Sequence, residues 1–358
     1  MKLIVLGLSL SSAWGNGHAT TFRALLKAFA ARGHDVHFLE RDVPWYRDHR
    51  DLPDPDFCRL SFYADMADLD RFRSEIAGAD AVIVGSYVPD GVAVARFVQA
   101  HARGTTAFYD IDTPVTLAKL ARGDHEYLSP DVIPHYDLYL SFTGGPTLDL
   151  IEHRYHAPAA RAFYCSVDPD LYAPTAALAR WDLSYLGTYS DDRQPTLERL
   201  LIQVARELPH RRFVVAGPMY PDTIVWPDNV DRIAHLAPAD HAGFYSASRF
   251  TLNVTRADMI AAGWSPSVRL FEASACGTAI VSDIWDGIDD VLAPGREILL
   301  ATDTADMVAV IEHADAEAIG SAARTRVLAA HTAAHRAAEL DHHLAIAAAR
   351  PRTLAGAA

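Results

Sequence analysis

How this chain folds is indicated by residues 2–40, KLIVLGLSLSSAWGNGHATTFRALLKAFAARGHDVHFLE. The first part, residues 2–10, is a short apolar run typical of a buried strand, and a glycine-containing loop follows it. Apolar residues then recur at helical spacing, Gly33 suits the end of that helix, and 34–40 is predicted to be a second strand. A strand, a glycine-rich loop, a helix and another strand form the first unit of a doubly wound parallel sheet.

The same alternation continues along the chain, with further strands predicted at 81–85, 105–109 and 138–142. Around Val167 the periodicity is lost and prolines appear, which predicts a linker. A second strand and helix series follows, and the chain ends in an alanine-rich helical tail. We therefore expect two Rossmann-like domains, 1–168 and 169–330, with the tail, 331–358, packing partly back on the first domain. Because ligands bind at the carboxyl ends of parallel strands, we expect the two sheets to face a deep interdomain cleft.

Composition excludes several classes of protein. The 358 residues carry a net charge of −14 and show no basic stripe, so no nucleic-acid partner is expected. The three cysteines are odd in number and far apart, which favours a reducing compartment over a disulfide framework. No signal-peptide cleavage site follows MKLIVLGLSL, and no apolar run approaches the ~20 residues of a membrane span. We expect a cytoplasmic protein without a transmembrane segment; the oligomeric state stays open.

The strongest functional signal is WSPSVRLFEASACGTAIVSD, residues 264–283. Ser265 is predicted to cap a helix, with proline as its first residue. The backbone N–H groups of Ser267 and Val268, together with the helix dipole, would then bind an anion.

Two charged residues follow on the same helix. Arg269 could add a cation for a diphosphate, and Glu272 lies three residues further on the same face. An ionised carboxylate only accepts hydrogen bonds, which suits the two hydroxyls of a ribose. The segment therefore predicts a nucleoside diphosphate site; the alternative is a surface helix with an i,i+3 ion pair.

This segment also carries a family resemblance. RLFEASACGTAIVSDIWDGIDDVLAPGREILL resembles the C-terminal part of GT-B glycosyltransferases, in particular the group related to the spore maturation protein CgeB, and SSAWGNGHATTFRALLKAFAARGHDVHFLERDVPWYRDHRDL is similar to the N-terminal part of that group. The resemblance covers most of the chain and implies a retaining transferase that uses no metal. It further implies that Glu272 binds the donor ribose and that the preceding turn holds the diphosphate.

The chain departs from the resemblance at one position. Many retaining relatives carry a second glutamate eight positions before the one that matches Glu272, and this chain has Trp264 there. The contact that the missing glutamate makes with the donor sugar must be lost or replaced, and Arg269 is a candidate to compensate. The departure bears on the donor sugar more than on the nucleotide.

The first domain offers three candidate loops. Glycines let a backbone approach a ligand closely, and glycine-containing loops follow predicted strands at Gly15, Asn16 and Gly17, and again at Gly144 and Gly145. By the resemblance, the 15–18 loop lies over the donor phosphates or the acceptor, where His18 could donate to a phosphate or to the transferred sugar. The alternatives are a locally capping histidine and a plain tight turn.

Asp110 and Asp112 have the spacing of a metal-binding pair of another glycosyltransferase fold. We favour a different role, in which one aspartate orients the acceptor hydroxyl or acts as its base. The remaining alternative is a turn that Asp112 caps. The predicted catalytic residues are therefore Asp110, Asp112 and His18, with no metal. The aromatic loop PWYRDHRDL, 44–52, could stack on an acceptor sugar or simply pack.

Further donor contacts are expected at strand ends of the second domain, where a plain turn is the alternative for each. They are Gly187, Tyr189, Arg193, Gly217, His235 and Arg256. The prediction is a glycosyltransferase that takes a sugar from a nucleoside diphosphate, UDP being favoured over GDP or TDP, and uses no other cofactor. The acceptor is open among a sugar, a glycan, a protein and a small molecule. The alternatives are a nucleotide-sugar epimerase, which should carry more carboxylates around the donor sugar, and a non-catalytic nucleotide-sugar-binding protein.

Overall fold

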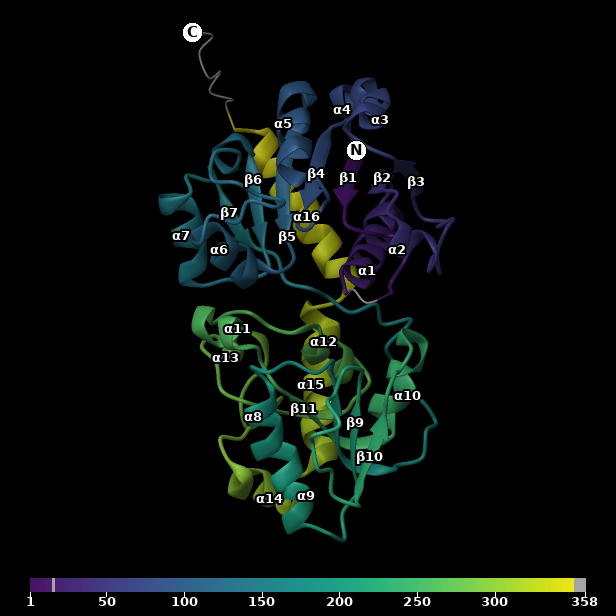
Figure 1. Ribbon diagram of the computed structural model, residues 1–358, viewed down its shortest axis with the longest axis vertical. Helices are drawn as coiled ribbons and strands as arrows, with labels where there is room; N and C mark the ends of the chain where they lie inside the picture. The colour runs from purple at the N-terminus through teal and green to yellow at the C-terminus, as the bar shows by residue number, and fades with distance from the viewer. Residues whose placement is uncertain (15–16, 351–358) are drawn as a thin grey trace. The chain divides into compact units, whose positions relative to one another are not determined.

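Two parallel sheets organise the part of the chain that the structure, a computed structural model, describes: residues 1–14 and 17–350. One compact unit is Met1–Tyr164 together with the chain from Ala333 onward, and the other is Cys165–Thr332. Each unit contains one sheet (Figure 1). The prediction of two Rossmann-like domains with parallel sheets is confirmed.

The sheet of the first unit has seven strands in the order β3-β2-β1-β4-β5-β6-β7, all paired in parallel. The strands are β1 (Lys2–Gly7), β2 (Asp35–Arg41), β3 (Arg59–Tyr63), β4 (Ala81–Gly85), β5 (Thr105–Asp110), β6 (Leu138–Ser141) and β7 (Ala160–Ala162). Five of them were predicted from sequence. The two that sequence analysis missed, β3 and β7, are the edge strands, whose polar residues hide the apolar pattern.

Continuous apolar runs form the middle of this sheet. Every residue of β4 and β5 is buried, because helices cover both faces of a parallel sheet. These helices are α1 (His18–Ala31), α2 (Pro44–Arg47), α3 (Met66–Leu69), η1 (Asp70–Phe72), α4 (Arg73–Gly78), α5 (Gly91–His101), α6 (Thr113–Ala121), η2 (Ile133–His135) and α7 (Pro146–Arg154). As predicted, α1 ends just before Gly33, whose φ of +89° is one that glycine adopts readily.

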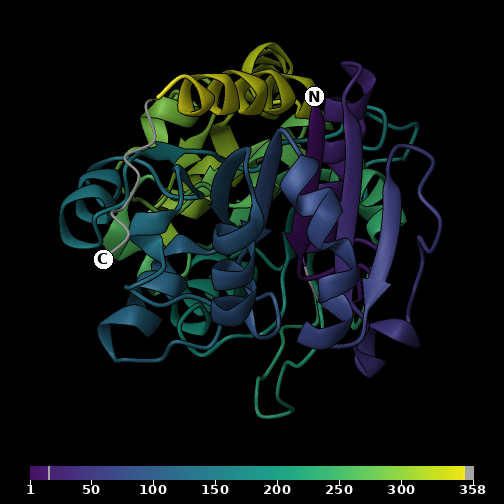
Figure 2. The ribbon, with the colours of Figure 1, turned by 90° about the horizontal axis from the view of Figure 1, so that it is seen from above.

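The last helix of the chain, α16 (Ala333–Ala348), belongs to the first unit. It packs against α1 and β5, and Asp341 accepts a hydrogen bond of 2.8 Å from Arg32. Both Figure 1 and Figure 2 show this yellow helix beside the sheet of the first unit. None of the helices between residues 1 and 14 or 17 and 350 is long and apolar enough to cross a membrane.

The sheet of the second unit has six parallel strands in the order β10-β9-β8-β11-β12-β13. They are β8 (Trp181–Leu186), β9 (Phe213–Ala216), β10 (Val230–Ile233), β11 (Ser248–Asn253), β12 (Ala279–Ser282) and β13 (Leu299–Leu300). The prediction that His235 ends a strand is wrong. Strand β10 already ends at Ile233, and His235 lies exposed in the loop beyond it.

The helices of the second unit are α8 (Gln194–Leu197), η3 (Glu198–Ile202), α9 (Gln203–Glu207), η4 (Pro238–Asp240), α10 (His241–Ser246), α11 (Ala257–Ala262), α12 (Val268–Ala275), α13 (Ile288–Val291), α14 (Thr304–His313) and α15 (Ala316–Ala330). One predicted helix start is wrong. The predicted helix begins at Pro266 with Ser265 as its cap, whereas α12 starts at Val268 and Ser267 is the capping position. The reason is that the Ser265 hydroxyl donates to the Gly263 carbonyl oxygen, 2.9 Å away, and so holds a turn before the helix.

Candidate active site

Helix α12 carries the central residues of the candidate site in the second unit. All of its residues from Arg269 to Ala275 are buried, whereas Val268 at its start is exposed. The helix lies against β11 and β12, which explains its apolar composition. The alternative of a surface helix with an i,i+3 ion pair is therefore wrong, and the two charged side chains of α12 lie inside the protein.

The start of α12 is tied to the end of β11 through Asn253. The Ser267 hydroxyl donates to Asn253 Oδ1 at 2.7 Å, and Arg269 Nη1 donates to the same oxygen at 3.1 Å. Asn253 Nδ2 in turn donates to the Ser282 hydroxyl at the end of β12, 2.9 Å away. Because the Ser267 hydroxyl is used in this way, it does not cap the helix, whose first N–H groups keep the polarity that attracts an anion.

Arg269 is a buried cation whose position is fixed on several sides. Its side chain is 9% exposed, its Nη2 donates to the Leu186 carbonyl oxygen, and its guanidinium lies 5.0 Å from the centre of the Tyr185 ring. Its Nε has no hydrogen-bond partner among residues 1–14 and 17–350. A buried cation with an unused donor is costly unless an anion compensates it, so this group is suited to bind a phosphate.

Glu272 lies one turn further along α12 and is 5% exposed. Burial raises the pKa of its carboxyl to about 7, although hydrogen bonds from Tyr172 and Tyr245 and the charge of Arg269 act in the opposite direction. Its Oε2 lies 3.9 Å from His241 Nδ1, and that nitrogen is 3.4 Å from the Tyr172 hydroxyl. Burial also lowers the pKa of His241. Glu272 thus sits in a polar cluster whose members can donate or accept hydrogen bonds.

Three members of this cluster, His241, Tyr172 and Tyr245, were not predicted from the sequence. His241 is the first residue of α10, and no pattern in the chain singled it out. Tyr172 lies in the stretch predicted as a linker, where the lack of periodicity gave no indication that its ring would be buried. Exposed His235, which was predicted to contact the donor, lies near enough that its charge lowers the pKa of His241.

The turns after β8 and β9 approach each other closely, and each contains a glycine at a point where there is no room for a side chain. A Cβ atom at Gly217, whose φ is +138°, would lie 2.1 Å from the Gly187 carbonyl oxygen. A Cβ atom at Gly187 would lie 2.7 Å from the Tyr185 hydroxyl. The two predicted donor-binding glycines are therefore together in space, at the carboxyl ends of neighbouring strands.

A pocket of about 630 Å³ lies beside these turns and brings three predicted donor contacts together. Tyr189, Arg193 and Arg256 line it, with Met219 and several acidic residues. Arg193 Nη2 donates to the Thr188 carbonyl oxygen at 2.7 Å, and its Nε has no hydrogen-bond partner within the described residues. Like Arg269, it offers an unused N–H donor.

Trp264 stands where the resemblance leads us to expect a second glutamate. Its backbone has a φ of +43°, which is rare and strained for a bulky residue. Its indole N–H donates to Asp290 Oδ2 at 2.7 Å, and the ring packs so closely on Gly287 that a Cβ atom there would lie 2.3 Å from Trp264 Cδ1. The indole is thus held in the turn just before α12.

In the first unit, Asp110 and Asp112 follow β5 but have different surroundings. Asp110 is fully buried and accepts hydrogen bonds from the Tyr139 hydroxyl, at 2.6 Å, and the Thr116 hydroxyl, at 2.7 Å. Burial raises the pKa of Asp110 to about 6. Asp112 is only partly buried, and its backbone N–H donates to Asp110 Oδ1 at 3.3 Å. The geometry therefore lets Asp112 meet a substrate, whereas Asp110 can act only through its neighbours.

Tyr87 joins His18 to Asp112, and sequence analysis missed it. Its hydroxyl donates to Asp112 Oδ2 at 3.0 Å, and its ring meets the His18 ring edge-on with a centroid separation of 5.3 Å. Burial lowers the pKa of His18 to about 4, so this imidazole is neutral at pH 7. Tyr87 follows β4 directly and has a φ of +63°, so the rule that ligands bind at strand ends could have found it.

The glycine loops of the first unit are only partly described. Gly15 and Asn16 lie outside the described residues, and Gly17 is the capping position of α1. Gly144 and Gly145 lie beside the Asp112 loop, because the Ser141 hydroxyl is within hydrogen-bonding distance of both the Thr113 hydroxyl, at 3.0 Å, and the Thr143 carbonyl oxygen, at 2.7 Å. A Cβ atom at Gly144 would lie 2.2 Å from the Tyr164 hydroxyl, which explains this glycine by packing.

Glu40, at the end of β2, holds the loop that follows β1. Its carboxylate is fully buried and accepts hydrogen bonds from the backbone N–H groups of Leu10, at 2.6 Å, and Ser11, at 2.9 Å. The Ser11 hydroxyl adds a third at 2.6 Å. In dinucleotide-binding folds an acidic residue near this position binds a ribose. Here the carboxylate is occupied by the protein itself.

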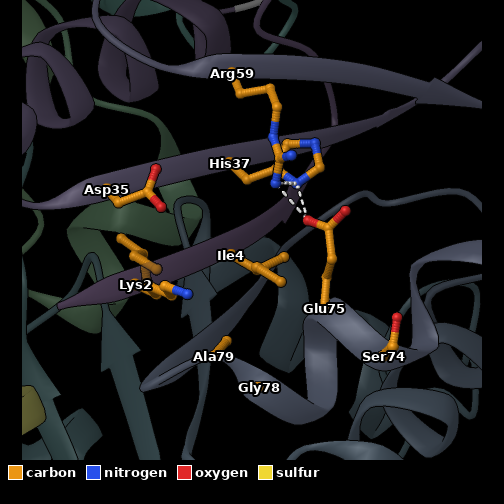
Figure 3. A pocket seen from close by; sticks show the side chains of 10 residues that line it. Lys2, Ile4, Asp35, His37, Arg59, Ser74, Glu75, Gly78 and Ala79 are labelled. Atoms are coloured by element: carbon orange, nitrogen blue, oxygen red, sulfur yellow. Dashed lines mark hydrogen bonds and ion pairs between the residues drawn. The ribbon is translucent and has the colours of Figure 1, made fainter.

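A second cavity, of about 620 Å³, lies near the other ends of β1, β2 and β3, as Figure 3 shows. Its His37 is 2.9 Å from Glu75 through Nδ1 and 2.9 Å from the Ser61 hydroxyl through Nε2, while Arg59 pairs with Glu75. The polar groups of His37, Arg59 and Glu75 thus find their hydrogen-bond partners within the protein. Across residues 1–14 and 17–350, no three His, Cys, Asp or Glu side chains are grouped so as to hold a metal ion.

Comparison with known proteins agrees with this architecture. Residues 193–342 match the family model described as "Glycosyl transferase-like", and none of the curated proteins matches the chain. Sucrose-phosphate synthase from Thermosynechococcus elongatus superposes with a TM-score of 0.70 at 17% identity, over 97% of this chain and 99% of that one. Anabaena HepE in complex with UDP gives 0.72 at 11%, over 97% and 100%, and alpha-glucosyltransferase in complex with UDP gives 0.68 at 12%, over 96% and 100%. The chain therefore has the fold of the GT-B glycosyltransferases, and its residues 193–342 match the glycosyl transferase-like family.

Proposed function

We propose that this protein is a glycosyltransferase that takes a sugar from a nucleoside diphosphate, with UDP favoured. The observation that carries the proposal is the start of α12, where no side chain caps the helix and the buried guanidinium of Arg269 follows in the first turn. A helix start and an arginine together suit a diphosphate. HepE and alpha-glucosyltransferase, which share the fold, were solved with UDP, and this supports UDP as the nucleotide.

In this proposal, Glu272 binds the ribose. Its carboxyl lies one turn beyond Arg269 on the same face of α12, so a diphosphate at the helix start would leave the ribose within its reach. The pocket beside Arg193 and Arg256 would take the remainder of the donor. With Trp264 in place of a glutamate, that donor is expected to be a sugar that does not need a carboxylate at this point.

The chemical step follows from these roles. The acceptor oxygen forms a bond to the anomeric carbon on the same face from which the diphosphate departs, as the bond from that carbon to the diphosphate breaks, and the electron pair leaves with the phosphate oxygen. The helix N–H groups and Arg269 stabilise the charge that develops there. Asp112, oriented by the Tyr87 hydroxyl, takes the proton of the acceptor hydroxyl, and neutral His18 donates a hydrogen bond.

The proposal includes retention at the anomeric carbon, no need for a metal, and a relationship to the CgeB group, all three on the resemblance described above. It is tested by release of the nucleoside diphosphate from UDP-, GDP- and TDP-glucose, with and without EDTA. NMR of the product gives its anomeric configuration. Release of UDP that EDTA does not reduce is expected. If no donor releases its nucleotide with any acceptor, and UDP does not bind, the proposal fails.

A further inference from the structure

Two tryptophans are exposed on loops that follow β1 and β2 in the first unit. Trp14 is 55% exposed and Trp45 is 54% exposed, although tryptophan usually buries most of its ring. Neither residue has a role in the donor site, which lies in the second unit. Large exposed aromatic side chains near a strand-end site point to a ligand that covers them.

The loops that carry the two indoles are held together by hydrogen bonds. The Ser12 hydroxyl donates to the His49 carbonyl oxygen at 2.8 Å, and the Leu52 N–H donates to the Ser11 carbonyl oxygen at 2.9 Å. Trp45 belongs to α2, and the turn after it returns to His49. Both tryptophans therefore belong to one loop cluster at the carboxyl edge of the sheet, the edge that also carries the His18 and Asp112 side chains.

One face of Trp14 is already occupied. Its ring stacks on the His49 imidazole with centroids 4.5 Å apart and planes inclined by 16°. With this stack in place, Trp14 is still 55% exposed. Because the histidine fixes the plane of the ring, a flat ligand that stacks there meets a rigid surface at little cost in entropy.

Two ion pairs with planar ends belong to the same loop cluster or to the helix beside it. Arg23 and Asp51 form a two-bond pair at 2.7 and 2.8 Å, and Arg47 and Asp42 form another at 3.0 and 2.7 Å. Hydrogen bonding from Arg47 lowers the pKa of Asp42, and both side chains of the Arg23 pair are partly exposed. Such pairs offer fixed donors and acceptors to the hydroxyls of a ligand.

We infer that Trp14 and Trp45 form a stacking platform for a pyranose ring, and hence that the acceptor is a carbohydrate; this rests on the proposed function. The apolar C–H face of a pyranose carries partial positive charge, which the negative π-face of an indole attracts. The hydroxyls at the rim of the sugar then meet the charged pairs. A ligand that has an apolar face and a rim of hydroxyls matches this surface better than a purely apolar ligand.

A membrane surface is the poorer candidate for the same tryptophans. Aromatic side chains that enter an anionic membrane are accompanied by an excess of basic residues. Here each of the two arginine pairs includes an aspartate, and the whole chain carries a net charge of −14. The test therefore includes lipid vesicles. Binding to vesicles through the two tryptophans, without binding of a saccharide, would contradict the inference.

The test is saturation-transfer NMR on the full chain with UDP present. The probes are methyl α-glucopyranoside, maltose, cellobiose and chitobiose, with p-nitrophenol as an aromatic probe and vesicles of phosphatidylcholine and phosphatidylglycerol in sedimentation. At least one saccharide is expected to bind. Trp14→Ala and Trp45→Ala should each weaken it about tenfold. Trp14→Phe and Trp45→Phe should keep most of the affinity, and Leu178→Ala, at a side chain 89% exposed elsewhere, should change nothing.

The same samples separate this inference from the proposed function, because UDP binding is measured in each by calorimetry. If UDP binds and no saccharide does, or if the alanine variants bind saccharide as wild type does, the platform is refuted and the transferase stands. The platform is also refuted if the alanine variants lose binding to vesicles or to p-nitrophenol but keep their affinity for the saccharide. If saccharide binds through the tryptophans but UDP does not bind, the proposed function fails instead.

Discussion

Arg269 Nη1 donates to Asn253 Oδ1 over 3.1 Å, and this bond joins the first turn of α12 to the end of the central strand β11. Ser267 donates to the same oxygen at 2.7 Å. The arginine is thereby fixed before any ligand arrives, so a bound diphosphate does not have to order it. Such preorganisation is what lets a buried cation stabilise a leaving group.

Glu272→Gln is expected to stabilise the protein at pH 8 and to have little effect at pH 5. The folded pKa of this carboxyl is raised to about 7 from an ordinary value of 4.5. Its contribution to stability is therefore fully present below about pH 4.5 and is lost as the pH rises through 7, because the unfolded chain ionises first. Glutamine does not ionise, so urea unfolding at pH 8 should show a gain of about 1–3 kcal/mol.

Glu339→Gln is the control of opposite sign for that experiment. Burial raises the pKa of Glu339, but His343 and Arg336 outweigh it and leave the pKa lowered. This carboxylate contributes stability that is present above about pH 4.5 and is lost as the pH falls through its lowered pKa, so Glu339→Gln should destabilise the fold at both pH 5 and pH 8. If Glu272→Gln showed the same trend as Glu339→Gln, the buried, readily protonated state of Glu272 would be wrong.

Tyr87→Phe is expected to reduce kcat about tenfold and to leave UDP binding unchanged. The substitution removes the hydroxyl that donates to Asp112 Oδ2. A carboxylate that loses a donor becomes harder to ionise, so the acidic limb of the kcat profile should move to higher pH. The matched control is Tyr136→Phe, since the buried hydroxyl of Tyr136 has no hydrogen-bond partner among the described residues. If the pH profile of kcat were unchanged in Tyr87→Phe, Asp112 would not be the group that takes the proton.

Glu40→Gln is expected to destabilise the first unit by about 2–4 kcal/mol. The amide would bring its own N–H groups toward the N–H groups of Leu10 and Ser11 that the carboxylate now binds. Glu75→Gln is the control, because the pair between Glu75 and Arg59 is exposed and its loss should cost less than about 1 kcal/mol. Equal costs for the two variants, measured by urea unfolding, would show that Glu40 does not hold the loop.

The interior of both sheets could be predicted from sequence, because buried parallel strands are continuous apolar runs. Strands β4 and β5 illustrate this, with every residue buried. The edge strand β3 was missed, since it pairs on one side only and begins with Arg59. Local pattern is insufficient there because its pairing with β2 depends on residues distant in the chain.

The candidate site could be predicted from the sequence only in part. Arg269 and Glu272 could be placed on one helix face from their spacing alone. The exact start of α12 could not, because two serines compete for the cap and only the fold decides that Ser267 bonds to Asn253. Tyr172 could not be found at all, since its burial beside Glu272 depends on how a segment without periodicity packs.

The most direct test of the donor site is calorimetric titration of UDP into wild type and Arg269→Lys, in EDTA. Lysine keeps the charge but loses the fork that binds Asn253 and the Leu186 carbonyl together. The control is Arg249→Lys, an arginine that donates to the carbonyl oxygens of Ile311 and Ala314. The account predicts that wild type and Arg249→Lys bind UDP equally, and that Arg269→Lys binds at least about tenfold more weakly. Equal affinity in Arg269→Lys, or binding that requires an added divalent cation, would contradict it.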